Sequence, residues 1–321
     1  MDLTTTAQIT QAVNAYYNRK LLENARPFLP HAMFADVKPL PANNGTLVKF
    51  RRYGTLAPNT TPLTEGITPE GKQLSHTDIQ TTVEQYGDFV IITDKLLFTT
   101  LDPVLSAAAA ELGEQAGQSL DIVIANVVHA GTNVQYSNGV AGRGSITTSD
   151  KLDAAEIKLA VRTLKRLLAQ RITSMVKPDA GYGTTPVDAA YIGIVHPDTT
   201  NDLWDDSKFR PVEEYANKAN VMPHEVGKML TVRFIESTFA KVFEGEGVGG
   251  IDVYSTVILG KHAYGITQIS GHALENIVKP LGSAGTSDPL NQRASSGWKA
   301  TMAAIRLNED YMVRIEHATT A

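Results

Sequence analysis

Residues 102–131 read DPVLSAAAAELGEQAGQSLDIVIANVVHAG and carry the strongest structural signal in the chain. Asp102 is a residue type that caps helix N-termini, Pro103 fits the first helical position, and Gly131 marks a C-terminal stop. The stretch therefore predicts a helix over 103–130, which at a rise of 1.5 Å per residue is roughly 40 Å long.

One stripe of this predicted helix is apolar, because small and aliphatic side chains recur at steps of three and four residues. Its members are Leu105, Ala109, Leu112, Ala116, Leu120, Val123 and Val127. The polar residues Glu111, Gln115, Gln118 and Asp121 lie outside the stripe. The helix is therefore expected to be a strut that packs on one side and faces solvent on the other.

Composition excludes several classes of protein. The 321 residues are 42% hydrophobic and 20% charged, as in a globular chain, and the net charge of −5 argues against a surface that neutralises nucleic-acid phosphates. The absence of cysteine excludes disulfides, thiolate metal sites and cysteine nucleophiles. The N-terminus lacks the pattern of a secretory signal, and the apolar run Ile122–Val128 is far shorter than a membrane span. A cytoplasmic protein without membrane contact is expected.

Upstream of the helix, residues 1–45 contain four prolines and no core periodicity, which is typical of an arm. Residues 46–54 read as a strand, residues 55–75 as a loop, and His76–Thr93 as a second strand-like run. The faces of this hairpin are so polar that it would be only marginally stable alone. Two interpretations remain open: the hairpin rests on something outside its own domain, or it folds back on that domain.

Downstream, Asp153-Ala154-Ala155-Glu156 resembles a capping box that opens a helix. Beyond residue 186, short strands alternate with short helices, which predicts a mixed α+β region. The runs Lys299–Leu307 and Tyr311–His317 are strand candidates, and the Asn308-Glu309-Asp310 segment between them is a plausible hairpin turn.

Motifs that would support catalysis or cofactor binding are weak. Gly245–Gly250 has the spacing of a dinucleotide-binding loop, but the strand-like run from Ile251 follows it where a helix is required, so a flexible loop is favoured. His224, Glu225 and the acidic group are expected to face solvent or cap helices, and the basic side of the helix after Asp153 to be solvated. The acidic group is Asp198, Asp202, Asp205 and Asp206.

The eight histidines show no compact ligand spacing, although clustering in space stays open. They stand at positions 31, 76, 129, 196, 224, 262, 272 and 317. The sequence therefore predicts no catalytic, cofactor-binding or metal site, and no enzyme.

The order of these parts resembles the major capsid proteins of tailed double-stranded DNA bacteriophages. Two stretches sharpen the resemblance: Asp153–Arg171 followed by Tyr191–Pro197 and the helix with Trp204, and the closing run Gly297–Asp310. The closing run is similar to the terminal strands of the N-four-type phage capsid family. Together with Tyr53–Leu56 and Thr64–Gly66, the likeness spans nearly the whole chain.

The resemblance implies an α+β fold of the Hong Kong 97 capsid type. Its parts would be an N-terminal arm, an extended loop, a peripheral domain with a long spine helix, and an axial domain. The arm is assigned to 1–45 and the extended loop to 46–85. The peripheral domain is assigned to 86–152 together with 291–321, with the spine helix at 103–130. The axial domain is assigned to 153–290.

The function implied is structural. The chain would build pentamers and hexamers of itself in an icosahedral shell that encloses DNA without binding it specifically, with portal, scaffolding or decoration proteins as possible partners. Assembly in a bacterial host cytoplasm would place it in the virion capsid. The alternatives are an encapsulin-like compartment shell and, with only the Gly245 loop in its favour, a nucleotide-dependent α/β enzyme.

Overall fold

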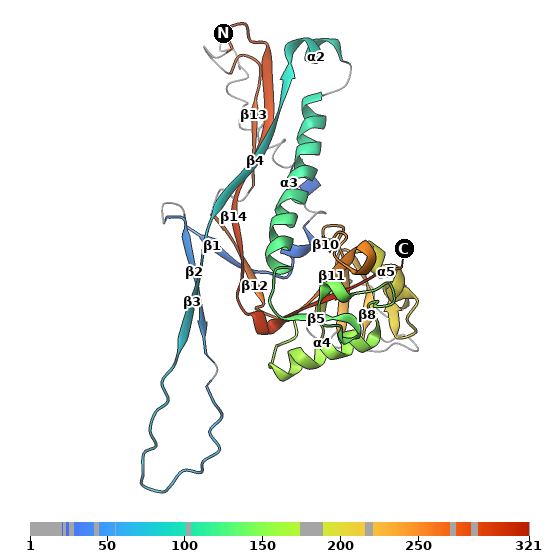
Figure 1. The fold of residues 1–321 in the computed structure, drawn as a ribbon. Coiled ribbons are helices and arrows are strands. Elements are labelled where there is room, and N and C mark those ends of the chain that lie inside the picture. Colours follow the sequence, from blue (N-terminus) through green and yellow to red (C-terminus); the bar gives the residue numbers. More distant parts are fainter. Residues whose placement is uncertain are drawn as a thin grey trace.

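The computed structural model shows one elongated molecule with two sheets, a long helix and a projecting hairpin (Figure 1). The predicted helix start at Asp102 and Pro103 lies outside the residues that the structure describes, as does most of the predicted arm. The described residues are 21, 24–25, 29–41, 45–54, 56–100, 104–173, 189–215, 221–269, 274–283 and 288–320.

The long helix α3, Val104–Val128, confirms the strongest sequence prediction. Its apolar face shares one core with the buried side chains Trp298, Ala300 and Met302 of strand β14. The buried apolar positions near its C-terminal end are Ile124, Ala125 and Val128, whereas the predicted Val123 and Val127 are only partly buried.

Asp121 was expected outside the apolar stripe and exposed, and this is wrong. Its side chain is completely buried, and it accepts hydrogen bonds from the backbone N–H and the ring Nδ1 of His31 at 2.9 and 2.7 Å. A buried carboxylate is stable only when such partners replace water. The N-terminal segment supplies them, and no local pattern in the helix reports that partner.

Beside α3 lies a five-stranded sheet built around one long strand, β14. The second half of β14 pairs with β12, which pairs in parallel with β1, while its first half lies between β4 and β13. Helix α3 covers one face of this sheet. Its strands are β1 Asp36–Leu40, β4 Glu84–Thr93, β12 Tyr264–Ile269, β13 Glu275–Lys279 and β14 Arg293–Arg306.

An eight-stranded sheet forms the second half of the molecule. Both of its faces are covered, because Ile192 and Ile194 of β6 join the core under α3 while Tyr191 and Val195 join the core under helix α4. Its strands are β5 Val134–Tyr136, β6 Tyr191–Val195, β7 Phe209–Pro211, β8 Glu225–Met229, β9 Val232–Glu236, β10 Val242–Phe243, β11 Val253–Leu259 and β15 Met312–His317.

Short helices surround the two sheets. Helix α4, Ala154–Arg166, begins as predicted at Asp153, whose carboxylate accepts hydrogen bonds from the N–H groups of Ala155 and Glu156. The others are α2 Asp94–Thr99, α5 Pro197–Trp204 and the single 3₁₀ turns η2 Pro30–Ala32, η3 Ser137–Gly139, η4 Arg143–Ser145, η5 Val212–Glu214, η7 Val248–Gly250 and η9 Glu309–Tyr311.

The predicted hairpin exists but is shorter than expected. Strands β2, Leu47–Tyr53, and β3, His76–Thr82, pair in antiparallel fashion. The run His76–Thr93 is not one strand, because it is interrupted at the buried Val83 and its second part, β4, joins the five-stranded sheet.

The predicted hairpin between the last two strands is wrong. β14 and β15 belong to different sheets, and Asn308–Tyr311 forms the corner between them. The side chain of Asn308 accepts from the N–H of Asp310, which starts the η9 turn. The same residue types favour a hairpin turn and a corner, so the sequence could not distinguish them.

The expected domain boundaries remain a proposal, and strand pairing argues for moving two of them. β12 and β13 fall inside the stretch 153–290 assigned to the axial domain, yet both pair with β14 in the five-stranded sheet. β15 falls inside 291–321, yet it pairs with β11 in the eight-stranded sheet. We therefore propose exchanging these strands between the peripheral and axial domains.

Gly113 allows the N-terminal segment to approach α3 closely, which yields a prediction. A Cβ at this position would lie 2.6 Å from the backbone oxygen of buried Leu21. Gly113→Ala should therefore lower the free energy of unfolding by about 1–3 kcal/mol, although alanine favours the helix itself. Urea unfolding measures this, with Gly71→Ala in open space as the control. A Gly113→Ala chain as stable as the parent would contradict the contact.

Candidate assembly surfaces

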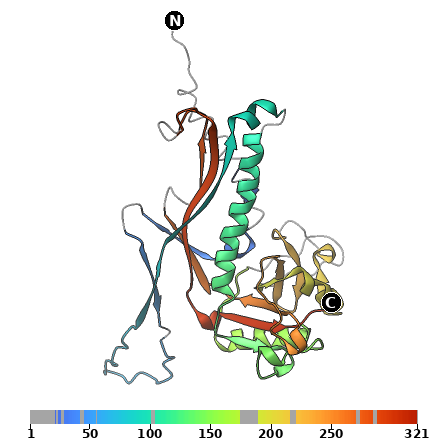
Figure 2. The same cartoon turned by 45° about the horizontal axis from the view of Figure 1, so that its top comes forward.

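The tip of the hairpin lies away from both sheets in two views of the molecule (Figures 1 and 2). Every residue of 56–75 is exposed, so for these residues the interpretation that the hairpin folds back on its own domain is wrong. Four of them are large and apolar: Leu56, Leu63, Ile67 and Leu74 are 51, 73, 67 and 54% exposed. A projecting loop with this composition is typical of a contact surface for another molecule.

The base of the hairpin is held firmly. Arg51 pairs with Asp78 across the two strands, with 2.9 Å between Nε and Oδ1, and this pairing lowers the pKa of the Asp78 carboxyl. Val48 is buried against Leu40 and Val83. The hairpin is therefore a stem of defined direction with an exposed end.

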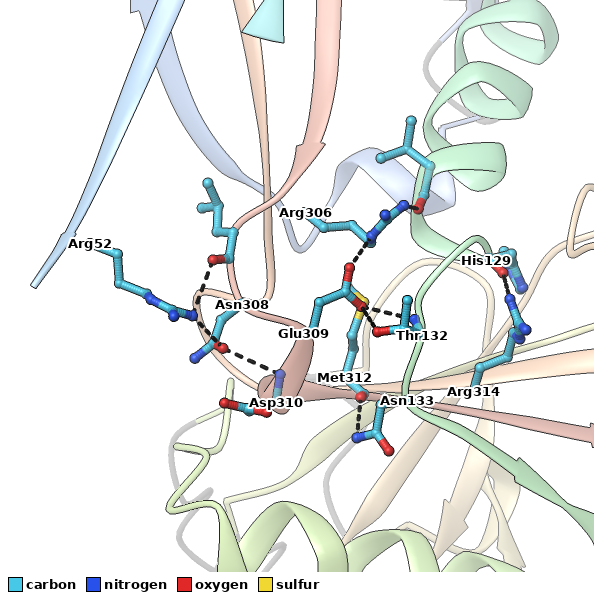
Figure 3. A network of polar contacts seen from close by, with 12 residues as sticks. Arg52, His129, Thr132, Asn133, Arg306, Asn308, Glu309, Asp310, Met312 and Arg314 are labelled. Carbon is cyan, nitrogen blue, oxygen red and sulfur yellow. Dashed lines mark hydrogen bonds and ion pairs between the residues drawn. The ribbon is translucent and has the colours of Figure 1, made fainter. Parts of the chain in front are cut away.

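Arg52 ties this stem to the corner between the sheets (Figure 3). Its Nη1 donates to Asn308 Oδ1 at 2.6 Å and to the carbonyl of Leu307 at 3.5 Å. Since Asn308 starts the corner, the direction of the hairpin is linked to the place where β14 passes into β15.

Glu309 ties the same corner to the end of α3 (Figure 3). Its carboxylate accepts from the N–H of Thr132 at 3.0 Å and from the guanidinium of Arg306. Arg306 also donates to the carbonyl of Val127 at 2.9 Å, and Asn133 donates to the carbonyl of Met312 at 2.9 Å. The hairpin, the long helix and both sheets therefore meet at one polar joint.

A groove of about 480 Å³ lies on the face of the five-stranded sheet opposite to α3. Its floor contains Gly87 and Gly297, and Gly297 pairs in register with Phe89 and Ile277 of the two flanking strands. Phe89 and Ile277 are 63 and 40% exposed, and the side chains of Lys279 and Lys299 also line the groove. Phe89 and Ile277 therefore give the groove two apolar walls, and its lining residues also include two lysines and Asp88.

Buried charges stabilise the eight-stranded sheet. The carboxylate of Glu316, which is completely buried, accepts from Arg143 Nε at 2.7 Å and lies 2.9 Å from Arg314 Nη2. The hydrogen bond to Glu316 raises the pKa of Arg143, whereas burial lowers that of Arg314. Arg143 also stacks 3.3 Å from the ring centroid of Phe243. These groups fix the turn at Arg143 onto β15.

Of the residues singled out for possible chemistry, Asp198, Asp202 and Asp205 line one surface pocket, and others make contacts within the fold. The Gly245–Gly250 loop leads into strand β11, as predicted. Asp206 accepts from the first N–H of α4. Glu225 was expected to face solvent, and this is wrong, because its buried carboxylate pairs with Arg233.

Two histidines that are distant in the sequence are neighbours in the structure. The Nε2 atoms of His31 and His129 lie 3.4 Å apart in the core. His272 lies outside the described residues. Within the part of the chain that the structure describes, no group of three or more His, Asp or Glu side chains is placed to hold a metal ion. Among the same residues, no helix is both long and apolar enough to cross a bilayer.

The subunit is therefore elongated, with a projecting hairpin, a groove on one sheet and a polar joint where its parts meet. Residues 77–315 match the family model described as phage capsid protein, and the chain belongs to that family. This membership makes it a shell-forming structural protein and favours the phage shell over the encapsulin-like alternative. A comparison with curated proteins gave no match.

Solved structures show the same fold, which is the Hong Kong 97 type of capsid fold. The capsid of Ralstonia phage GP4 is similar with a TM-score of 0.71 and 14% identity over 92% of this chain and 90% of that chain. The cyanophage Pam1 capsid has a TM-score of 0.60 and 16% identity over 92% of both chains. A virus-like particle from Pyrococcus furiosus has a TM-score of 0.52 and 9% identity over 94 and 99%.

Proposed function

We propose that this chain assembles with copies of itself, as pentamers and hexamers, into a closed icosahedral shell around a phage genome, and that it catalyses no reaction. The projecting hairpin carries this proposal, because its exposed apolar tip needs a partner outside its own chain. The genome is enclosed without specific binding, in keeping with the net charge of −5. Portal, scaffolding or decoration proteins are further expected partners, and the host cytoplasm is the expected place of assembly.

The groove on the five-stranded sheet is the proposed binding site for the hairpin tip of a second copy of the chain. The tip offers Leu63 and Ile67 together with Glu65, and the groove offers apolar walls and two lysines. Residues of β4, β13 and β14 line the groove, and these strands lie on the far side of the hairpin base from the tip, so tip and groove do not meet within one chain (Figure 1). A contact between two different surfaces of identical subunits is heterologous, and such contacts build rings and shells when they close.

Many copies of a modest contact suffice for a stable particle. Each subunit in a ring both gives a tip and receives one, so every subunit is held at two places at once. Binding at the second place is then effectively intramolecular, which multiplies weak affinities.

Disulfide trapping tests this binding site. Because the chain contains no cysteine, only the introduced cysteines can form cross-links. A chain with Ile67→Cys and Ile277→Cys is expected to form a ladder of cross-linked oligomers after mild oxidation of assembled particles, since a disulfide requires Cβ atoms within about 4.5 Å. The matched control combines Ile67→Cys with Val248→Cys, an exposed residue in the η7 turn of the other half of the molecule. It should give no ladder.

Electron microscopy of the same samples separates the two parts of the proposal. Closed shells without cross-links would disprove the groove as the binding site while supporting assembly. Absence of shells in the parent chain under all conditions of salt and concentration would contradict the assembly function itself.

A further inference from the structure

A buried chain of polar side chains links the N-terminal segment, helix α3 and the eight-stranded sheet. It runs from Asp121 on α3 through His31 in η2 and His129 after α3 to Ser255 on β11, and all four residues are at most 2% exposed. His31 Nδ1 lies 2.7 Å from Asp121 Oδ2, the two Nε2 atoms are 3.4 Å apart, and His129 Nδ1 lies 2.8 Å from Ser255 Oγ.

The chemistry of these groups fixes where the protons lie. A carboxylate only accepts hydrogen bonds, so His31 Nδ1 carries a proton and donates it to Asp121. With both rings neutral, His31 Nε2 is an acceptor, His129 donates to it from Nε2, and the Ser255 hydroxyl donates to His129 Nδ1. Each ring nitrogen then has a partner.

One proton added to the pair of rings is accommodated, because one ring can still donate from Nε2 to the Nε2 of the other. The two Nδ1 atoms stay paired with Asp121 and Ser255. Each ring nitrogen is again paired, so the contact between the rings persists.

A second proton cannot be accommodated. It would place two N–H groups against each other at 3.4 Å, with a positive charge on both buried rings. Burial lowers the pKa of His129 well below its ordinary value of 6.5, and the nearby charges of His31, Arg314 and Lys241 lower it further. Asp121 offsets one of the two ring charges at most.

The groups on the other packed elements do not relieve this conflict. From β15, the guanidinium of Arg314 donates to the backbone carbonyl of His129, and the nearby carboxylate of Glu316 is already paired with Arg314. From β12, the hydroxyl of Tyr264 donates to the carbonyl of His31. Burial raises the pKa of Tyr264, so this hydroxyl stays neutral in acid and supplies no counter-charge.

We propose that Asp121, His31 and His129 form an acid-sensitive latch, which tolerates one added proton and opens on the second. Opening separates η2 from the end of α3, because the repulsion acts between the rings of His31 and His129. His129 is also bonded to Ser255 and Arg314 of the eight-stranded sheet, so its displacement weakens the contact with that sheet too. The latch goes beyond the shell-building role, since it makes the link between the two halves of the subunit depend on pH.

The sign of the effect follows from proton linkage. A histidine whose pKa is lowered by folding binds fewer protons in the folded chain than in the unfolded one. Its contribution to stability is therefore complete above its ordinary value of 6.5 and is lost as the pH falls below that value towards the lowered pKa. Acid, and not base, opens the latch.

Hydrogen–deuterium exchange of the full chain at a series of pH values tests the latch. After correction for the intrinsic exchange rate, segments 121–131 and 253–257 should lose protection together, with a midpoint below 6.5. In His129→Gln, the side-chain amide can donate to His31 and takes up no proton, so this transition should vanish or move by about one pH unit or more. The control is His262→Gln, an exposed histidine that pairs with Asp36, and it should leave the midpoint unchanged.

The remaining outcomes are equally decisive. A parent chain without the transition, or His129→Gln with the parental midpoint, would overturn the latch. His317 is a second buried histidine, whose pKa burial lowers to about 4, so a transition that moves with His317→Gln but not with His129→Gln would also overturn it. If His129→Gln does not fold, the exchange pattern of the parent chain is the test. Loss of protection at 29–32, 121–131 and 253–257 at a higher pH than in the rest of the chain would support the latch. Simultaneous loss of protection throughout the chain would overturn it.

Discussion

Replacement of residues 55–75 by a short Gly-Ser turn is expected to abolish closed particles while both sheets stay folded. The residues removed are exposed wherever the structure describes them, so the core loses almost nothing. A standard interface buries about 800 Å² per partner, and loss of part of that area at every subunit is multiplied over the whole particle.

Circular dichroism and electron microscopy of the shortened chain and the parent provide the measurement. Folded subunits without shells would support the expectation. Normal shells from the shortened chain would exclude the tip as an assembly contact, and an unfolded chain would show that the tip stabilises its own subunit.

Leu112→Asp is expected to lower the free energy of unfolding by about 5 kcal/mol, which is enough to prevent accumulation of folded protein. Leu112 is 3% exposed and lies in the core that α3 shares with β14, so the new carboxylate would be buried. The matched control is Ile122→Asp, which places the same charge on the same helix at a position that is 42% exposed. It should change stability by less than about 1 kcal/mol.

Soluble yield and urea unfolding report both variants of α3. If Leu112→Asp gave normal yield and an unchanged midpoint, the packing of the helix against the sheet would have to be wrong. If Ile122→Asp were equally damaging, burial would not be the cause of either effect.

Local signals predicted the secondary structure of several segments well. The start of α4 at Asp153 was predicted as observed, and the predicted end of α3 at residue 130 lies two residues beyond the observed one at Val128. These segments have strong periodicity or clear end signals, which act over a few residues. The family resemblance added the order of parts, and the match of residues 77–315 confirms the family itself.

Contacts between distant residues explain what the sequence missed. Asp121 appeared solvent-facing because its partner His31 is 90 residues away in the chain. The groove depends on the register that places Phe89 opposite Gly297, and neither residue is unusual within its own strand. Likewise, nothing local to Asn308 indicates that β14 and β15 enter different sheets.

The polar joint at Asn308–Tyr311 also has a geometric consequence for any surface tiled by this subunit. It connects the half that carries the groove to the half formed by the eight-stranded sheet, and so it sets the angle between them. Arg52 bonds to Asn308 in this joint, so the direction of the hairpin is linked to the same angle. When subunits repeat side by side, a small tilt in each one adds up around the ring and becomes curvature. We therefore expect changes in the hydrogen bonds of four side chains, Arg52, Arg306, Asn308 and Glu309, to alter the curvature of a shell built from this subunit.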